Sequence, residues 1–216
     1  MNIQELMAII ANKKYYENAE FFIKYNEKLG HNLLFSIIPS NPEHNDFLEA
    51  NGLTDKNNWY AIDAYDPDAK TPANKIAVCK IVCDRITRKG KSIKYGEICL
   101  LSTSEDQPDV ASVKICKKSF YQGKGISREL LNLAQVAMFK KEHIDTLIAN
   151  ITQCGCYGMA ELFDIYTHLG FTPQTKLREP ANKYINIPAI KVYEPCELKD
   201  IGFTAINIQT VCHNLG

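Results

Sequence analysis

A short loop in the middle of the chain carries the residues best suited to bind an anion. Residues 121–127 read YQGKGIS, so that Gly123 and Gly125 stand on either side of Lys124. Glycines allow several backbone N–H groups to turn toward one point, and the N-terminus of a helix adds donors that have no partner within the helix. The loop therefore predicts a binding site for a phosphate or pyrophosphate group.

The segment that follows the loop has the periodicity of a helix. Apolar residues recur at spacings of three to five, which is the pattern of one buried helical face: Ile126, Leu130, Leu131, Ala134 and Met138. Ser127 or Gly125 can begin this helix. Arg128 falls in the first turn, where a cation opposes the helix dipole at a cost of up to about 1 kcal/mol. A bound anion would reverse that cost; the alternative is a solvated basic turn without a ligand.

Two common phosphate-binding motifs do not fit the loop. The dinucleotide fingerprint G-x-G-x-x-G requires a third glycine, and that position is Arg128. The P-loop requires Ser or Thr directly after its Gly-Lys pair, and that position is Gly125. The loop must therefore belong to another class of anion site.

The loop resembles the acyl-CoA loop of the GCN5-related N-acetyltransferase (GNAT) superfamily, whose pattern is Gln/Arg-x-x-Gly-x-Gly/Ala. Gln122, Gly125 and Ser127 fill the three positions, with Ser127 as a small-residue departure. The family's second signature, Tyr-x-x-x-Gly-Phe at the end of a helix, is matched by residues 166–171 (YTHLGF) about forty residues later. Two motifs in this order are much more specific than either motif alone. The resemblance covers residues 110–175 well and residues 33–110 loosely.

The resemblance implies an α/β fold of the α+β type, in which helices flank a central, mostly antiparallel sheet. It implies an acyl-CoA-dependent N-acyltransferase that transfers acetyl from acetyl-CoA to a primary amine. In such a protein, main-chain groups of the strand before the loop would pair with the pantetheine arm: Ile115, Cys116 and Lys117. Lys124 and Arg128 would screen the charge of the pyrophosphate. The pyrophosphate itself would be bound by the backbone N–H groups of the loop: Gln122, Gly123, Lys124, Gly125, Ile126 and Ser127.

Aminolysis of a thioester needs a neutral amine and a proton for the departing thiolate. The resemblance places Tyr166 as the general acid, and the alternative is a tyrosine that only packs on an apolar helix. Glu97, on an expected strand, is the candidate general base. Glu105, Asp106, Asp109 or a chain of water molecules are the alternatives.

Several departures from the family pattern keep other functions open. Met159 stands where family members often carry an asparagine that touches the cofactor, and the preceding segment, residues 152–158, is longer than usual. A degenerate GNAT-fold protein that binds CoA or a partner in a regulatory role, without robust catalysis, is therefore the alternative. A third possibility is an acyltransferase with a cysteine nucleophile at Cys154 or Cys156. The acceptor amine cannot be read from the sequence.

The composition describes a globular chain without an overall charge. It has 216 residues, 45% of them hydrophobic, and a formal net charge of zero. We expect a single GNAT-like acetyltransferase domain over residues 31–216, preceded by a helical extension over residues 1–30 that covers the domain or forms a homodimer surface. A zero net charge favours neither nucleic acid nor an anionic membrane as a partner. No apolar run approaches the roughly twenty residues of a membrane span.

The eight cysteines do not form a recognisable metal motif. The pair Cys154-Gly155-Cys156 has a single spacer residue rather than the two of zinc motifs, and no second pair follows it. We therefore expect no metal. No signal peptide is visible, and reduced cysteines in a cytoplasmic protein are the simplest interpretation.

The remaining elements are predicted from periodicity and turn residues. Beyond residues 1–30 and the helix after the loop, we expect helices from residue 41 to about residue 52 and over 158–169. We expect strands at residues 33–39, 59–65, 75–83, 93–101, 110–117, 145–151, 184–187 and 190–193, and a further one within 203–211. The strands before the loop predict an antiparallel meander that leads into it.

Overall fold

The computed structural model describes residues 1–12, 16, 18–39, 58–70, 74–88, 90–103, 120–151, 157–174 and 187–206. Several predicted features lie outside these ranges: the helix after residue 41, the strand at 110–117, the acidic residues Glu105, Asp106 and Asp109, and the Cys154–Cys156 segment.

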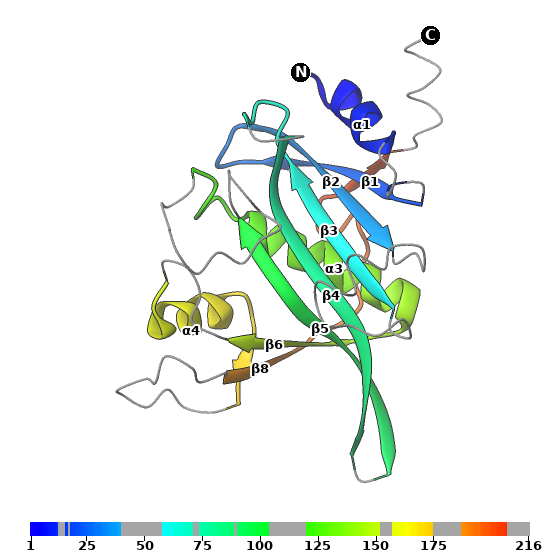
Figure 1. The fold of residues 1–216 in the computed structure, drawn as a ribbon, viewed down its shortest axis with the longest axis vertical. Coiled ribbons are helices and arrows are strands. Elements are labelled where there is room, and N and C mark those ends of the chain that lie inside the picture. The colour runs from blue at the N-terminus through cyan, green and yellow to red at the C-terminus, as the bar shows by residue number, and fades with distance from the viewer. Residues whose placement is uncertain are drawn as a thin grey trace.

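One sheet forms the centre of the molecule, and its described strands follow the order β7-β8-β6-β5-β4-β3-β2-β1-β9 (Figure 1). The strands are β1 (Glu20–Asn26), β2 (His31–Pro39), β3 (Trp59–Tyr65), β4 (Lys75–Arg88), β5 (Lys91–Thr103), β6 (Thr146–Ile151), β7 (Thr172–Pro173), β8 (Ile187–Val192) and β9 (Thr204–Ile206). Neighbours from β1 to β5 pair antiparallel, as the predicted meander requires, whereas β5 and β6 pair parallel.

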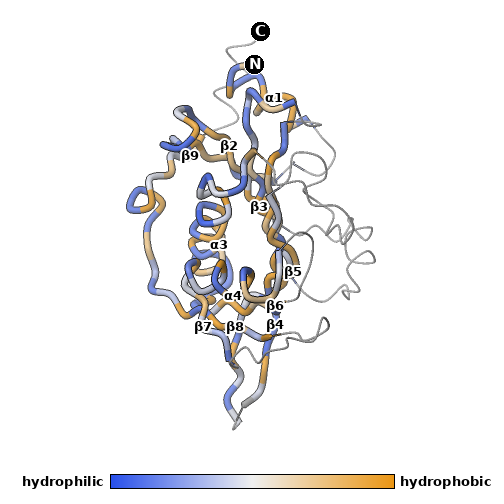
Figure 2. The backbone as a smooth tube through the Cα atoms, turned by 90° about the vertical axis from the view of Figure 1, so that its left-hand side faces the viewer, coloured by the Kyte–Doolittle hydropathy of each residue, from blue (hydrophilic) through white to orange (hydrophobic). Residues whose placement is uncertain are grey.

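Helices cover both faces of this sheet. The described helices are α1 (Ile3–Ala11), α3 (Ile126–Glu142) and α4 (Met159–His168). Helices α3 and α4 share one hydrophobic core with the sheet, and Figure 2 shows both on the same side of the strands. Helix α1 packs on the opposite face of the sheet through Leu6, Met7 and Ile10. The predicted mixed α/β architecture, with a mostly antiparallel sheet and flanking helices, is confirmed.

The prediction of a helix over residues 1–30 is wrong after α1. Residues Glu20–Asn26 form β1, which pairs with β2 along its whole length, and Gly30 lies in the hairpin turn between them at φ 79°. Phe21 is buried against the α1 face and Phe22 against the α3 face. A strand that is covered on both faces has apolar residues at consecutive positions, so its spacing can resemble that of a helix.

Most of the other predicted elements are confirmed within a few residues. Strand β3 has the predicted bounds, β6 begins one residue later than predicted, and α4 is one residue shorter than predicted at each end. Strands β4 and β5 are longer than predicted because they continue into a hairpin. The prediction of two separate strands at residues 184–187 and 190–193 is wrong, because β8 runs without a break from Ile187 to Val192. Pro188 lies within it, and its carbonyl accepts a hydrogen bond from the Gln174 N–H at 2.8 Å. No helix among the described residues is long and apolar enough to cross a bilayer.

Candidate functional site

The glycines of the loop adopt backbone conformations that other residues avoid. Gly123 has a φ of 75°, and Gly125, which directly precedes α3, has a φ of 83°. A Cβ atom on either glycine would meet none of the described residues within 4 Å. Gly125 offers no side chain to cap α3. The N–H groups at the start of the helix, including those of Ile126 and Ser127, have no partner within the helix and can bind a ligand.

The hairpin turn between β1 and β2 holds the carbonyl groups of the loop. Lys28 Nζ donates to the Gly123 carbonyl at 2.8 Å, and Asn26 Nδ2 donates to the Lys124 carbonyl at 3.1 Å. The N–H of a peptide group points away from its C=O. Fixing the Lys124 carbonyl on the hairpin therefore turns the Gly125 N–H away from the hairpin.

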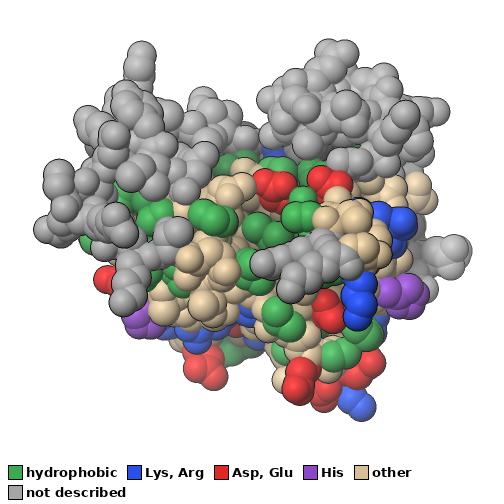
Figure 3. All heavy atoms as spheres, turned by 90° about the horizontal axis from the view of Figure 1, so that it is seen from below, with side chains coloured by type: hydrophobic (Ala, Val, Ile, Leu, Met, Phe, Trp, Pro, Cys, Tyr) green, Lys and Arg blue, Asp and Glu red, His purple; other side chains and the backbone are tan. Residues whose placement is uncertain are grey.

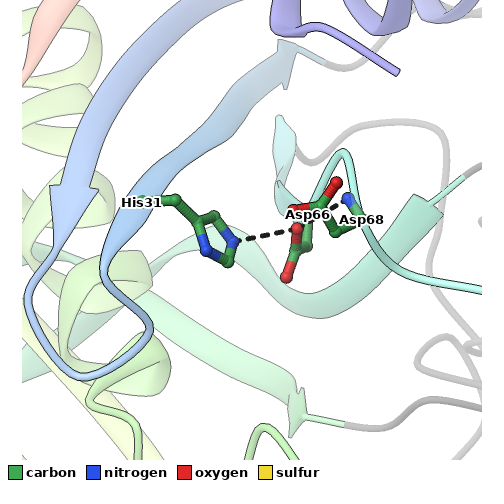
Figure 4. Close-up of side chains that lie close together, drawn as sticks. All are labelled: His31, Asp66 and Asp68. Carbon is green, nitrogen blue, oxygen red and sulfur yellow. Dashed lines mark hydrogen bonds and ion pairs between the residues drawn. The ribbon is translucent and has the colours of Figure 1, made fainter.

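A buried carboxylate anchors the beginning of the loop. Asp66 is 2% exposed, and its Oδ2 accepts a hydrogen bond from the Tyr121 hydroxyl at 2.9 Å. Its Oδ1 lies 3.0 Å from His31 Nε2 and 2.8 Å from the main-chain N of Asp68 (Figure 4). His31, Asp66 and Asp68 could together offer three ligand atoms to a metal ion. Since both oxygens of Asp66 already accept hydrogen bonds, the cluster is explained as the anchor of the loop.

Gln122, the first residue of the family pattern, carries a buried polar atom, Oε1, that has no hydrogen-bond partner in the part of the chain that the structure describes. Rotation of the amide exchanges its oxygen and nitrogen, so the same position can present either an acceptor or a donor. A buried polar group without a partner costs about 1–3 kcal/mol. A ligand in the loop could recover that energy.

The two sequence signatures meet in space. Arg128, in the first turn of α3, donates from Nη2 to the His168 carbonyl at the end of α4 at 3.2 Å. Lys191 Nζ donates to the next carbonyl, that of Leu169, at 2.8 Å. Burial, followed by the charge of Arg128, lowers the pKa of Lys191. Arg128 thus has a hydrogen-bond partner within the protein. The contact is favourable because cations stabilise the C-terminus of a helix. The carbonyl of His168 accounts for this arginine without a bound anion.

The Tyr-x-x-x-Gly-Phe signature forms the C-terminal cap of α4. Gly170 is left-handed at φ 88°, the Phe171 N–H donates to the Tyr166 carbonyl, and the Gly170 N–H donates to the Thr167 carbonyl. These are the two hydrogen bonds of a Schellman motif, whose usual apolar contact joins the residues of the longer bond. The rings of Tyr166 and Phe171 make that contact at 5.5 Å between centroids. Tyr166 therefore has a structural role in addition to any chemical one.

The candidate base, Glu97, lies where β5 and β6 separate. These strands pair only from Gly96 with Leu147 to Ile98 with Ala149, after which β5 continues along β4 and β6 along β8. The register between β4 and β5 shifts directly beyond Ile98, which leaves Cys99 as an extra residue of a bulge. Glu97 Oε1 accepts a hydrogen bond from Asn150 Nδ2 at 2.9 Å.

Strand β5 connects this point of separation with the loop. It ends at Thr103, whose hydroxyl lies 3.1 Å from that of Ser127 in the first turn of α3. Strand β5 therefore carries Glu97 close to its separation from β6, and its end contacts the helix that follows the glycine loop. Gly96 makes the close packing beneath it possible, since a Cβ there would lie 2.9 Å from Leu147 and 3.0 Å from Ile81.

Some predicted site residues are not brought together here. Ile115, Cys116 and Lys117 lie outside the described residues. Met159 is 5% exposed and belongs to the hydrophobic core, which gives it a packing role at the start of α4. Lys124 Nζ lies 5.1 Å from the centroid of the Phe120 ring, beside the loop.

Sequence reasoning missed the supports of the loop. Asn26, Lys28 and Asp66 are far from it in the sequence, and no local motif marks them. The one available signal was that Asp66 directly follows the predicted strand at residues 59–65.

No protein-family model matches the chain, and no curated protein matches it in sequence. Several solved structures are similar in fold. Arabidopsis thaliana NAA60 in complex with a bisubstrate analogue gives a TM-score of 0.44 at 12% identity, over 74% of this chain and 98% of that chain. The ribosomal-protein-S5-alanine acetyltransferase from Vibrio fischeri gives 0.41 at 17% identity, over 70% and 68%. The NatC complex bound to Gag peptide and CoA gives 0.40 at 21% identity, over 62% and 71%. These likenesses are partial, and the function of this chain is inferred from its own residues.

Proposed function

We propose that the chain is a GNAT-type N-acyltransferase, which transfers acetyl from acetyl-CoA to a primary amine. The observation that carries the proposal is the meeting of the two signature motifs. The glycine loop presents N–H groups at the start of α3 that have no partner within the helix, and Arg128 links that turn to the cap of α4 that contains Tyr166. Anion-binding donors and a candidate acid thus belong to adjoining elements.

The loop fits the pyrophosphate of CoA. The N–H groups of Gly125, Ile126 and Ser127 would receive it, and Lys124 would screen its charge. Arg128 retains guanidinium donors beyond the one bonded to His168, so it can add to this screening. The pantetheine arm would extend from the loop toward the separation of β5 and β6. Main-chain groups of Ile115, Cys116 and Lys117 would pair with it, as the family resemblance implies.

The chemistry would be direct aminolysis of the thioester. Glu97, directly or through water, would accept the proton that the substrate ammonium must lose before attack. A C–N bond forms as the C–S bond breaks, and the Tyr166 hydroxyl would donate its proton to the departing sulfur. The attacking nitrogen loses its second proton as the amide forms, and this proton, passed through water, would restore the Tyr166 hydroxyl. Asn150 holds Glu97 in place on β5.

Binding of CoA can be tested separately from turnover. Isothermal titration with CoA should show binding, and a thiol-release assay with acetyl-CoA and a panel of amines should show activity. Gly125→Ala should weaken CoA binding at least tenfold, because an alanine at φ 83° must move the loop. Gly90→Ala is the matched control, since Gly90 has a φ of 75°, equally open surroundings and no place in the loop. An unmodified chain that does not bind CoA would refute the proposal.

A GNAT-fold protein that binds CoA without catalysis is the second candidate. It is favoured by Met159, which is buried in the core where many family members carry a polar contact, and by the structural use of Tyr166 in the cap. CoA binding without turnover of any amine in the panel would support it. Loss of turnover in a Cys154→Ser/Cys156→Ser double variant would instead support the cysteine-nucleophile alternative.

A further inference from the structure

The hairpin between β4 and β5 extends well beyond the sheet. Strand β3 pairs with β4 only as far as Val82, and β6 pairs with β5 only from Gly96 onward. Within residues 84–95, Asp84–Arg88 and Lys91–Tyr95 therefore form the two strands of a ribbon, and no strand among the described residues pairs with either of its outer edges. We call this ribbon the hairpin arm; Figure 1 shows it projecting from the end of the sheet.

The arm concentrates positive charge in a chain whose net charge is zero. It contains one acidic residue, Asp84, and five cationic ones, a net charge of four positive: Arg85, Arg88, Lys89, Lys91 and Lys94. The carboxylate of Asp84 already accepts hydrogen bonds from the Arg85 N–H and the Tyr95 hydroxyl. Figure 3, which views the molecule from this end, shows acidic and basic side chains side by side. The excess of cations on the arm therefore follows from the sequence of residues 84–95.

The pairing register places like charges opposite each other. Arg85 pairs with Lys94 and Arg88 pairs with Lys91, although directly opposite like charges destabilise an antiparallel ladder. The first pair is partly relieved, because Lys94 Nζ lies 3.6 Å from Glu142 Oε2.

Two apolar side chains are also exposed on the arm. The directly paired Ile86 and Ile93 are 50% and 44% exposed. The arm therefore combines like charges at opposed positions with exposed isoleucines, and none of its described residues belongs to the hydrophobic core. Exposed apolar residues among charges are typical of a surface that binds another molecule.

We propose that the hairpin arm binds a nucleic-acid duplex, with the ribbon lying in a groove. Side chains alternate between the two faces of a strand, so Lys91 and Ile93 share one face while Lys94 lies on the other, together with its partner Arg85. Because the ribbon has cations on both faces, a partner that contacts all of them must present negative charge on both sides of the ribbon. A groove walled by two phosphate strands supplies it, whereas the surface of an acidic protein would meet one face only.

The dimensions of a duplex agree with this geometry. The major groove of B-form DNA is about 12 Å wide and admits a two-stranded β-ribbon. The sequence-based expectation that nucleic acid is not a partner rested on the zero net charge. Net charge averages over the whole chain, but binding to phosphates depends on cations gathered at one place.

Fluorescence anisotropy of the full chain with labelled duplexes tests the proposal. With a 20-base-pair DNA duplex we expect a dissociation constant of roughly 10⁻⁶–10⁻⁴ M near physiological salt, and a log–log salt slope of about −3 for three or four phosphate contacts. The same measurement with a 20-base-pair RNA duplex shows whether the arm binds DNA or RNA, since both offer the same phosphate groups. Arg85→Glu and Lys91→Glu, one on each face, should each weaken binding about tenfold.

The double variant Lys70→Glu/Lys199→Glu is the charge-matched control. Both lysines are exposed and outside the arm, and their reversal changes the net charge as much as the double variant Arg85→Glu/Lys91→Glu does. The control should lose less than twofold in affinity, and circular dichroism should show that all variants are folded. The proposal is overturned if neither duplex binds at 50 mM salt, if control and arm variants lose affinity equally, or if polyglutamate competes as well as unlabelled duplex. The last result would indicate an acidic protein instead.

Discussion

Tyr166 serves the packing of α4 whatever its chemical role. Its ring contacts Phe171 in the helix cap, and its hydroxyl is the proposed proton donor. Tyr166→Phe keeps the ring and removes the proton. We therefore expect kcat to fall about 10²-fold or more, as for loss of a general acid, while the KM for acetyl-CoA and the melting temperature stay close to those of the unmodified chain.

A second substitution at the same position separates the two roles. Tyr166→Leu should lower the melting temperature as well, because the ring pair of the cap is lost. Equal kcat values for Tyr166→Phe and the unmodified chain would remove Tyr166 from the mechanism and leave it with its role in the cap alone.

Asp66 is expected to act on CoA binding through Tyr121. Asp66→Ala leaves the buried Tyr121 hydroxyl without this acceptor, at a cost of about 1–3 kcal/mol. We expect the KM for acetyl-CoA to rise about tenfold with kcat changed less than threefold. Asp66→Asn should restore part of the affinity, because its amide oxygen still accepts a hydrogen bond. Asp68→Ala is the control, since its main-chain N–H remains; an equal effect in this variant would contradict the assignment.

Cys83 provides a check on cysteine chemistry near the sheet. Burial, followed by the charge of Glu142, raises the pKa of its thiol to about 12. Because only the thiolate reacts, the rate of alkylation by iodoacetamide should rise about tenfold per pH unit from pH 7.5 to pH 10. A thiol of ordinary pKa would level off near pH 9. Peptide mass spectrometry measures the rate, and a plateau below pH 10 would show that the thiol is not shielded.

At the scale of the element, the cap of α4 should be sensitive to a single methyl group. Gly170→Ala places a Cβ at φ 88°, 3.3 Å from Cε and Nζ of Lys191. The left-handed conformation costs an alanine about 1–2 kcal/mol. For a chain of this size we expect the melting temperature to fall by roughly 2–8 °C. A variant that melts within 1 °C of the unmodified chain would show that the cap adjusts without strain.

Elements defined by local signals were predicted well, and an element defined by its partner was not. Strand β3 and helix α3 carry clear periodicity and clear boundaries, and both appear where expected. Strand β1 was predicted as a helix because its apolar residues do not alternate with polar ones. Phe21 and Phe22 are consecutive and are buried on opposite faces of the sheet. Whether such a segment is a strand depends on a neighbour with free hydrogen-bonding groups, which here is β2.

At the scale of the whole molecule, CoA should stabilise the fold. A ligand present at one hundred times its dissociation constant adds about 2.7 kcal/mol to the free energy of unfolding. For this chain that corresponds to a rise in melting temperature of roughly 5–11 °C. Differential scanning fluorimetry measures the shift, and Gly125→Ala at the same CoA concentration should show a much smaller one. No shift in the unmodified chain would mean that the loop does not hold CoA.

The sequence by itself determined the position of the glycine loop, the helix that follows it and the cap motif of α4. Each of these depends on glycines and periodicities within a few residues, so local conformational preferences are enough to define them. Only the tertiary structure decided which distant residues support the loop: Asn26, Lys28 and Asp66 reach it from the β1–β2 hairpin and from the end of β3. It also decided that the hairpin arm stands free of the sheet. These outcomes depend on strand pairing between segments far apart in the chain, and local spacing does not encode that pairing.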